Sequence, residues 1–215
     1  MRPRGQQLSI PLLLSAYRRG WFPMADPLTG AIRWYHPDPR AILPLERFHV
    51  PGSLGRELRR GRFDIRCDTD FEQVMRACAA PRPDEDLSWI DDRFIEAYTL
   101  LHRAGHAHSV EAWRDGRLVG GLYGVHVGGA FMGESMFSRP DLGGTNASKV
   151  CLVHLVGWLR HRGFLLLDTQ FRTPHLDRFG CLEVSREQYL ELLAEALARE
   201  VDWGCYSADA AARRP

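Results

Sequence analysis

Residues 106–138 read HAHSVEAWRDGRLVGGLYGVHVGGAFMGESMFS, and this stretch decides the fold class. The dipeptides Asp115-Gly116 and Gly128-Gly129 are typical of tight hairpin turns. They divide the stretch into three segments that we expect to be the strands of an antiparallel meander. The expected strands are residues 108–113, 117–125 and 130–137.

Short strands and helices alternate on both sides of this meander. Phe63, Ile65 and Cys67 alternate with charged side chains, which indicates a half-buried strand. A capping box, Ser185-x-x-Gln188, predicts the start of the last helix. The other predicted elements are helices at residues 70–80, 90–101 and 146–162, and a buried apolar strand at residues 164–168.

Residues 1–50 have a different texture, with many prolines interleaved with aromatic side chains after a helix expected at residues 7–19. Such a segment favours a small lobe packed on a larger neighbour. The predicted fold is therefore α+β, with a mixed, largely antiparallel sheet flanked by helices in residues 51–205. The small N-terminal lobe is residues 1–50, and residues 206–215 are expected to be a frayed tail.

The composition indicates a globular protein of the cytoplasm. The chain has 215 residues, of which 45% are apolar, enough for a domain with a real core. It has no run of about 18 apolar residues that would predict a membrane span, and its polar N-terminus has no secretory core. Five cysteines without CxxC spacing fit a reducing compartment and argue against a zinc ribbon.

Positive charge is concentrated at the N-terminal end of the chain. Residues 1–66 hold 12 Arg and 5 acidic residues, whereas residues 67–215 carry a net charge of −6. Arginine pairs bidentately with phosphate, so this end is a candidate for contact with a phosphate backbone. Chance clustering on a solvated face is the alternative. The candidate contact residues are Arg56, Arg59, Arg60 and Arg62.

Glu134 is the first candidate for chemistry. It lies in an expected strand among apolar or small neighbours, and a buried carboxylate needs a partner or it becomes protonated. Two interpretations stay open, namely a salt bridge to an arginine and an acceptor for a substrate ammonium or hydroxyl group.

Asp168 and Gln170 form the second candidate. Asp168 ends the most apolar predicted strand, and if that strand continues, Gln170 lies on the same face. A carboxylate and an amide at a strand end can build a polar site into an apolar pocket. The alternative is a turn-capping Asp followed by a surface Gln.

Other catalytic chemistries lack support in the sequence. His106 and His108 share a strand face, but no third ligand is marked, so no metal site is predicted. Ser135 lacks the Gly-x-Ser-x-Gly pattern of a nucleophile elbow. The chain also has no GxxxxGK[ST] phosphate-binding loop.

Taken together, the motifs resemble those of the leucyl/phenylalanyl-tRNA–protein transferases. The matching stretches fall in order along most of the chain, and their combination is specific, although no single stretch is. They are AYRRGWFP at residues 16–23, WYHPDPR at 34–40, SWI at 88–90, GHAHSVEAW at 105–113, LVGGLYGV at 118–125, GESMFSR at 133–139, NASK at 146–149 and DTQ at 168–170.

This resemblance implies a fold and a reaction. It implies a C-terminal domain similar to GNAT-type acetyltransferases behind the small lobe. It implies transfer of Leu or Phe, and less readily Met, from Leu-tRNA or Phe-tRNA to proteins that begin with Arg or Lys, which creates an N-degron for proteolysis. No metal or organic cofactor is implied, and the aminoacyl ester is already activated, so no ATP is needed. We also expect a monomer.

The resemblance also implies roles for particular residues. Asp168 and Gln170 match the proposed catalytic pair of the family, and Glu134 matches an acid near the aminoacyl group. The terminal adenosine of the tRNA would lie at Met24, Trp34 and Trp89, although some members have an aromatic residue where this chain has Met24. The Leu or Phe side chain would be held by Leu122, Phe131, Ser135, Met136, Leu152, Leu155, Leu159 and Leu167.

A mechanism follows as a hypothesis, together with two competing functions. Gln170 would position the acceptor amine through its carbonyl oxygen, while Asp168 polarises the amine or receives its proton. A GNAT-type enzyme using acyl-CoA would want a Gly-rich pyrophosphate loop, and Gly143-Gly144-Thr145-Asn146 matches that poorly. The other alternative is a tRNA-binding module without catalysis.

Overall fold

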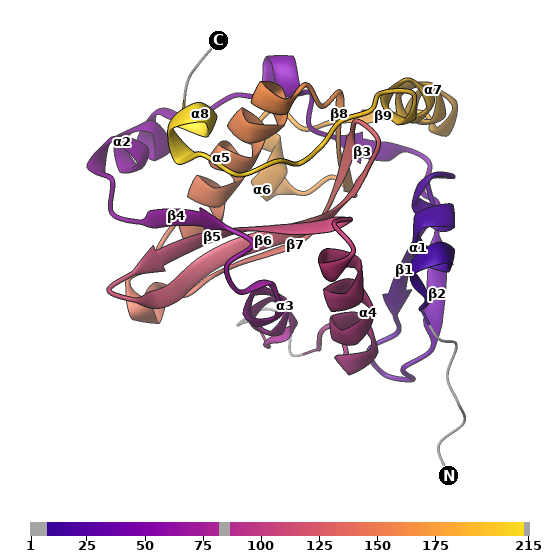
Figure 1. The fold of residues 1–215 in the computed structure, drawn as a ribbon, viewed down its shortest axis with the longest axis horizontal. Helices are drawn as coiled ribbons and strands as arrows, with labels where there is room; N and C mark the ends of the chain where they lie inside the picture. The colour runs from indigo at the N-terminus through magenta and orange to yellow at the C-terminus, as the bar shows by residue number, and fades with distance from the viewer. Residues whose placement is uncertain (1–7, 82–86, 213–215) are drawn as a thin grey trace.

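The computed structural model describes residues 8–81 and 87–212, which form two sheets and the helices around them (Figure 1). The large sheet has seven strands in the order β4-β5-β6-β7-β8-β3-β9. Adjacent strands of this sheet are antiparallel, except for β7 and β8, which are parallel. The predicted mixed and largely antiparallel sheet is therefore confirmed. The strands are β3 (Arg40–Ile42), β4 (Asp64–Cys67), β5 (Ala107–Arg114), β6 (Arg117–Val127), β7 (Ala130–Ser138), β8 (Leu166–Gln170) and β9 (Leu182–Val184).

The meander β5-β6-β7 forms the centre of this sheet, as its turn residues predict. Asp115 and Gly116 both have positive φ, at 50° and 73°, and Gly128 has φ 56°. Left-handed turn residues match the twist of an antiparallel pair, which is why these dipeptides connect the strands so tightly.

Helices cover both faces of the large sheet, which completes the predicted α+β fold. On one face, Tyr123 and Val125 of β6 share a buried cluster with α3 (Phe71–Ala79) and α4 (Asp92–Arg103). On the other face, Val119 and Leu122 of the same strand pack with α5 (Ala147–Arg162), which in turn contacts α2 (Gly52–Arg60). The remaining helical segments are η1 (Leu45–Arg47), η2 (Pro140–Leu142), α6 (Pro174–Asp177), α7 (Arg186–Leu197) and α8 (Ala208–Ala212).

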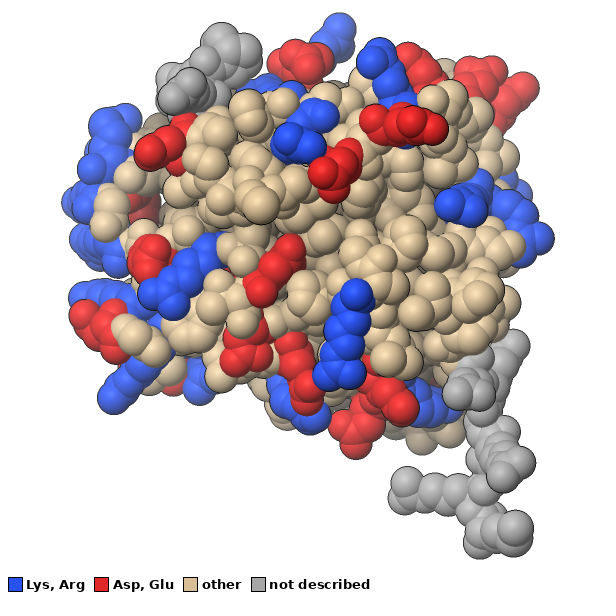
Figure 2. All heavy atoms as spheres, in the orientation of Figure 1, with Lys and Arg blue, Asp and Glu red and all other residues tan. Residues whose placement is uncertain are grey.

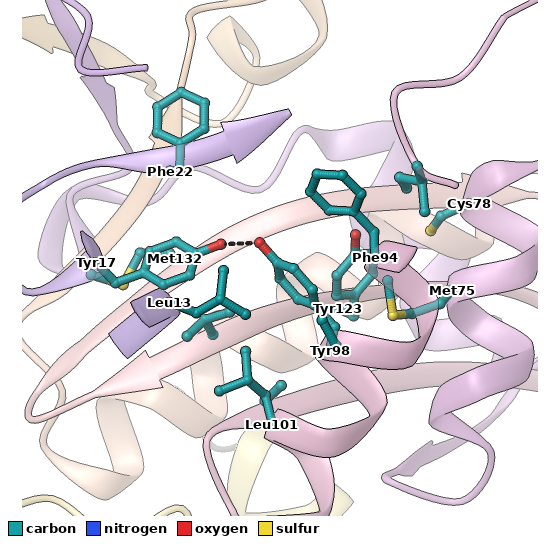
Figure 3. Packing of buried hydrophobic residues seen from close by; sticks show 14 of the residues in the cluster. Leu13, Tyr17, Phe22, Met75, Cys78, Phe94, Tyr98, Leu101, Tyr123 and Met132 are labelled. Atoms are coloured by element: carbon teal, nitrogen blue, oxygen red, sulfur yellow. Dashed lines mark hydrogen bonds between the residues drawn. The ribbon is translucent and has the colours of Figure 1, made fainter. Parts of the chain in front are cut away.

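The N-terminal segment packs on the first of these faces. Helix α1 (Ile10–Tyr17) begins after Ser9, whose hydroxyl accepts the Leu12 amide at 3.4 Å. The strands β1 (Phe22–Ala25) and β2 (Ile32–Tyr35) then form a two-stranded sheet. Figure 3 shows side chains of α1 lying against those of α4 in one continuous core.

The boundary of the predicted small lobe needs correction at its C-terminal end. Residues 40–42 fall inside the segment 1–50, yet they form β3, which lies between β8 and β9 in the large sheet. The chain therefore enters the large sheet before residue 50. This pairing joins residues more than a hundred positions apart, and local sequence patterns do not reveal it.

The C-terminal end of the described chain is ordered against α5. The capping box at Ser185 is present and starts α7, as predicted. Within the segment expected to be a frayed tail, residues 208–212 form α8, whose Ala211 is buried. A Cβ on Gly157 of α5 would lie 1.8 Å from the Ala211 carbonyl oxygen, so only glycine permits this close packing. Residues 213–215 of the predicted tail lie outside the described residues.

Candidate active site

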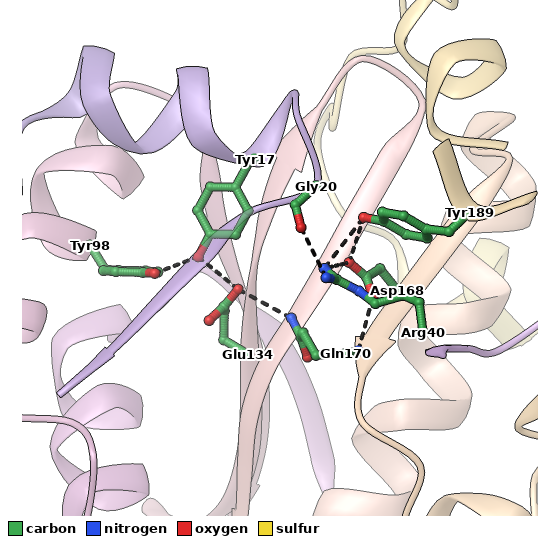
Figure 4. A network of polar contacts seen from close by, with 8 residues as sticks. All are labelled: Tyr17, Gly20, Arg40, Tyr98, Glu134, Asp168, Gln170 and Tyr189. Atoms are coloured by element: carbon green, nitrogen blue, oxygen red, sulfur yellow. Dashed lines mark hydrogen bonds and ion pairs between the residues drawn. The ribbon is translucent and has the colours of Figure 1, made fainter. Parts of the chain in front are cut away.

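Glu134 occupies a bulge in β7. Tyr123 of β6 pairs with Ser135 and Gly124 pairs with Gly133, which leaves Glu134 as an extra residue on its strand. A bulge re-aims the side chain it carries. Close packing at Gly124 supports the irregular pairing, because a Cβ there would lie 2.3 Å from the Met132 carbonyl oxygen. Glu134 consequently points toward the N-terminal lobe and β8 (Figure 4).

The partners of Glu134 are neutral groups. The Tyr17 hydroxyl donates to its Oε1 at 2.8 Å, and the Gln170 side-chain amide lies 3.4 Å from the same oxygen. The hydroxyls of Tyr17 and Tyr98 are also hydrogen-bonded to each other. Within residues 8–81 and 87–212 no arginine forms an ion pair with Glu134, so the salt-bridge interpretation is not supported.

Burial gives Glu134 an unusual ionisation. Desolvation raises the pKa of its carboxyl group from 4.5 to about 8, and the Asp168 charge acts in the same direction. The hydrogen bond from Tyr17 and the charge of Arg40 oppose this rise without cancelling it. The half-buried carboxyl group can therefore exchange a proton near neutral pH.

Asp168 is fully buried and fully hydrogen-bonded. Arg40 holds it with two bonds, from Nε to Oδ1 at 2.9 Å and from an Nη atom to Oδ2 at 2.6 Å. The Tyr189 hydroxyl donates to Oδ2 at 2.9 Å, and the backbone amide of Gln170 donates to Oδ1 at 2.9 Å. Four donors thus occupy the lone-pair positions of the carboxylate and fix its orientation.

Gln170 lies at a second irregularity in the sheet. Strand β8 continues past Asp168 as predicted, but Ala41 pairs with Gln170 while Ile42 pairs with Asp168, so Thr169 is extra. Gln170 has φ 58°, a left-handed conformation that is uncommon for a residue other than glycine. Its side chain is buried and reaches Glu134, so the alternative of a surface Gln is wrong.

Four residues of this network were not predicted from the sequence. Tyr17 and Arg40 lie within the matched stretches but have no local feature that marks them, and Tyr98 and Tyr189 lie on helices where tyrosine is ordinary core material. Each meets its partner across a long separation in sequence, for example 128 residues between Arg40 and Asp168. The only local signal that Arg40 is buried is the apolar run that follows it, Ala41-Ile42-Leu43.

All but one of the residues expected to hold the amino-acid side chain come together between the sheet and α5, where Met136 packs on the edge of the cluster. The exception is Ser135, which is half-buried and pairs with Tyr123, a residue of the cluster on the opposite face. The remaining members are almost completely buried, so a guest can enter only if side chains move. They are Leu122, Phe131, Leu152, Leu155, Leu159 and Leu167.

The residues expected at the terminal adenosine lie in and beside the two-stranded sheet. Met24, Trp34 and Trp89 are partly buried and pack against the core of the lobe and α4. The Trp89 carbonyl accepts the Ala25 amide at 3.4 Å, which joins this segment to β1. The structure thus brings these three residues to one region, while their contact with a nucleotide stays a prediction.

The four arginines expected at a tRNA backbone are exposed on and just after α2. Figure 2 shows basic side chains gathered along the left edge of the molecule, where Figure 1 places α2. Arg60 and Arg62 each contact Glu57 at 3.2 Å, which partly neutralises them. Arg56 and Arg59 form no ion pair with any residue that the structure describes.

The partner of His108 is Asp68, and not His106, which shares its strand face in the sequence pattern. His108 Nδ1 lies 2.8 Å from Asp68, and His102 completes a group whose ligand atoms lie within 4.8 Å of one another. His102 Nδ1 also lies 2.8 Å from the Ala107 carbonyl, and Asp68 accepts the Ser109 amide. Hydrogen bonds within the protein engage Nδ1 of both histidines and the Asp68 carboxylate, whereas the buried Nε2 of His108 has no hydrogen-bond partner among the described residues.

Among the helices of the described residues, none is both long enough and apolar enough to span a bilayer.

Comparison with known families gives two matches that together cover most of the chain. The family model for the leucyl/phenylalanyl-tRNA protein transferase matches residues 42–194. The model for the N-terminal domain of leucyl/phenylalanyl-tRNA protein transferase matches residues 6–38.

Relatives with the name leucyl/phenylalanyl-tRNA–protein transferase are similar over nearly their whole length. The one from Paramagnetospirillum magneticum is 55% identical over 204 residues, 94% of this chain and 93% of the relative. The one from Salinibacter ruber is 52% identical over 196 residues, 91% of this chain and 83% of the relative.

Solved structures show only a distant likeness. A ribosomal-protein-alanine N-acetyltransferase from Brucella melitensis biovar Abortus 2308 has a TM-score of 0.38 and 21% identity, covering 67% of this chain and 96% of its own. L-PGS from Bacillus licheniformis has a TM-score of 0.41 and 11% identity, covering 73% of this chain and 51% of its own. The strand order described above, not these scores, defines the fold.

Proposed function

The chain belongs to the leucyl/phenylalanyl-tRNA–protein transferase family, and we propose that it transfers Leu or Phe, and less readily Met, from tRNA to proteins that begin with Arg or Lys. The product would expose a new N-terminal residue that marks the acceptor for proteolysis. Aminoacyl esters are activated already, so the reaction needs no cofactor.

The main observation in support of a mechanism is that the side chains of Glu134 and Gln170 contact each other, each at an irregularity of its own strand. The pKa of an N-terminal amine is about 7.7–8.0. The pKa of Glu134 is raised by burial to about 8, so a proton passes between the amine and this carboxylate with little change in free energy. Glu134 is accordingly our proposed proton acceptor, with Gln170 orienting the amine.

The bond changes balance as follows. The amine nitrogen attacks the ester carbonyl carbon, an amide bond forms, and the ester bond to the ribose oxygen breaks. One proton leaves the amine for Glu134, and one proton returns to the departing ribose oxygen. Much of the rate enhancement would come from holding the two substrates together.

This assignment changes the role of Asp168. From the sequence, Asp168 was a candidate to polarise the amine or receive its proton, but four donors already occupy its oxygens. We propose that Asp168 instead acts on Gln170, whose backbone amide donates to its Oδ1. The catalytic group still consists of Glu134, Gln170 and Asp168, with the last as a positioning residue.

Binding of the tRNA would use three separate regions. We propose that Met24, Trp34 and Trp89 contact the terminal adenosine, and that the cluster under α5 holds the Leu or Phe side chain. The exposed arginines of α2 would contact backbone phosphates without reading sequence. We also infer that the protein acts in the cytoplasm, where charged tRNA is found, and as a monomer.

The test is transfer of labelled Phe from Phe-tRNA to a peptide with N-terminal Arg, using purified protein. A matched peptide with an acetylated N-terminus should gain no label, because it lacks the attacking amine. Binding of Phe-tRNA without transfer would support the module without catalysis. Acylation of the free peptide by acetyl-CoA would support the GNAT-type alternative.

A further inference from the structure

We propose that Arg40 is a positioning residue for the transfer reaction. It clamps Asp168, and Asp168 in turn fixes the backbone of Gln170 so that the Gln170 amide faces Glu134. The proposal rests on the transferase function proposed above. It assigns Arg40 no contact with substrate.

The contacts of Arg40 join three parts of the molecule at the site (Figure 4). From β3 its guanidinium donates twice to Asp168 of β8 and once, at 2.9 Å, to the Gly20 carbonyl after α1. One Nη atom also lies 3.4 Å from the Tyr189 hydroxyl of α7. One side chain thus sets the lobe, the sheet and α7 relative to one another.

Aromatic rings fix the plane of this guanidinium. Its central carbon lies 4.8 Å from the centre of the Phe22 ring and 4.5 Å from that of Tyr189. A planar fork held between rings matches a carboxylate bidentately, which a lysine ammonium cannot do. Only 1% of Arg40 is exposed, so water does not compete for its hydrogen bonds.

The link from Asp168 to Gln170 is a backbone hydrogen bond. Asp168 Oδ1 accepts two hydrogen bonds, one from Arg40 Nε and one from the Gln170 backbone nitrogen, and each donor lies 2.9 Å from this oxygen. Gln170 holds φ 58°, a conformation that persists only when its surroundings impose it. Rotation of the Asp168 carboxylate would release this amide and let the Gln170 side chain move away from Glu134.

Stability alone does not account for a buried pair of this kind. Apolar residues of similar volume often replace a buried ion pair without loss of stability. What they cannot replace is the directed bond from Asp168 to the Gln170 amide. The geometry therefore points to a role in orienting Gln170.

Four variants test the proposal by a double-mutant cycle: Arg40→Gln, Asp168→Asn, the double variant, and Arg93→Gln as control. Either single change leaves a buried charge without its partner, whereas the double variant has a neutral pair. Asparagine at position 168 can still accept the Gln170 amide proton through its Oδ1. Arg93 is the matched control because it also pairs with an aspartate and donates to a lobe carbonyl, that of Gly30, away from Gln170.

The first readout is single-turnover and steady-state transfer, measured below the melting temperature of every variant. Each single change should lower kcat by about 100-fold, because Gln170 is misplaced, while KM for Phe-tRNA changes little. The double variant should regain at least about tenfold in kcat over Arg40→Gln. Arg93→Gln should keep the kcat of the unaltered protein.

The second readout needs no substrate and separates this proposal from the transferase function. Amide hydrogen exchange at Gln170 should be slow in the unaltered protein and in Arg93→Gln, fast in Arg40→Gln, and slow again in the double variant. Unchanged exchange in Arg40→Gln would overturn the proposal, whatever the activity. A double variant as inactive as Asp168→Asn would also overturn it, because that is the result expected if Asp168 accepts the proton.

Discussion

Replacing Glu134 by Gln should make the protein more stable at high pH. The pKa of Glu134 is raised by burial from 4.5 to about 8, so the folded state holds this proton more tightly than the unfolded state does. Its contribution to stability is complete below about pH 4.5 and is lost as pH rises through about 8. Glutamine has no such proton, yet its Oε1 can still accept the Tyr17 hydroxyl that bonds Glu134 at 2.8 Å.

The size of the effect follows from the two pKa values. A rise from 4.5 to about 8 corresponds to at most about 5 kcal/mol. Because Glu134 is half-buried and keeps some contact with water, we expect roughly half of that, about 2–3 kcal/mol. Near pH 5 the two proteins should be nearly equal in stability, and near pH 9 the Gln variant should be more stable by this amount.

Urea denaturation between pH 5 and pH 9 measures this difference directly. Glu195→Gln is the matched control, because Glu195 is exposed on α7 and its replacement should leave the pH dependence unchanged. If the free energies of unfolding of the Glu134→Gln variant and the unaltered protein stay parallel over the whole range, the carboxyl group is not perturbed and our assignment of the proton is wrong.

Three further perturbations test other parts of the structure. Leu159→Ala removes a fully buried side chain of the expected amino-acid pocket, so urea denaturation should show a loss of about 2–5 kcal/mol, and competition between Leu-tRNA and Phe-tRNA should shift toward Phe. Equal preference before and after would remove Leu159 from the pocket. Gly124→Ala should destabilise by about 1–3 kcal/mol and lower kcat, because its Cβ would displace Met132 and the bulge at Glu134. Arg59→Gln should reduce the slope of log Kd for tRNA against log salt by about 1, whereas Arg76→Gln on α3 should leave that slope unchanged.

The central sheet could be predicted from the sequence because its signals are local. Two turn dipeptides fix the meander, and the capping box at Ser185 fixes the start of α7. Glu134 and Asp168 stood out because each lies in or ends an apolar run, and Gln170 because it follows Asp168 on the same expected strand face. The structure brings all three together.

The arrangement of the site could not be predicted in the same way. The bulges that turn Glu134 and Gln170 toward each other depend on pairing with β6 and β3, which are set by tertiary contacts. Arg40 is one of many arginines in the first part of the chain, and no local pattern separates a buried clamp from an exposed phosphate contact. The order of α8 likewise depends on a contact with Gly157 that no pattern in residues 206–215 reveals.

The most direct test of the account is the rate of Phe transfer from Phe-tRNA to an Arg-initiated peptide in a single turnover at pH 8. We expect rapid transfer by the unaltered protein and by Glu195→Gln, and a rate lower by about 100-fold for Glu134→Gln, because the proton of the amine loses its acceptor. Transfer at the same rate in all three proteins would contradict the role of Glu134, and absence of transfer in the unaltered protein would contradict the proposed function.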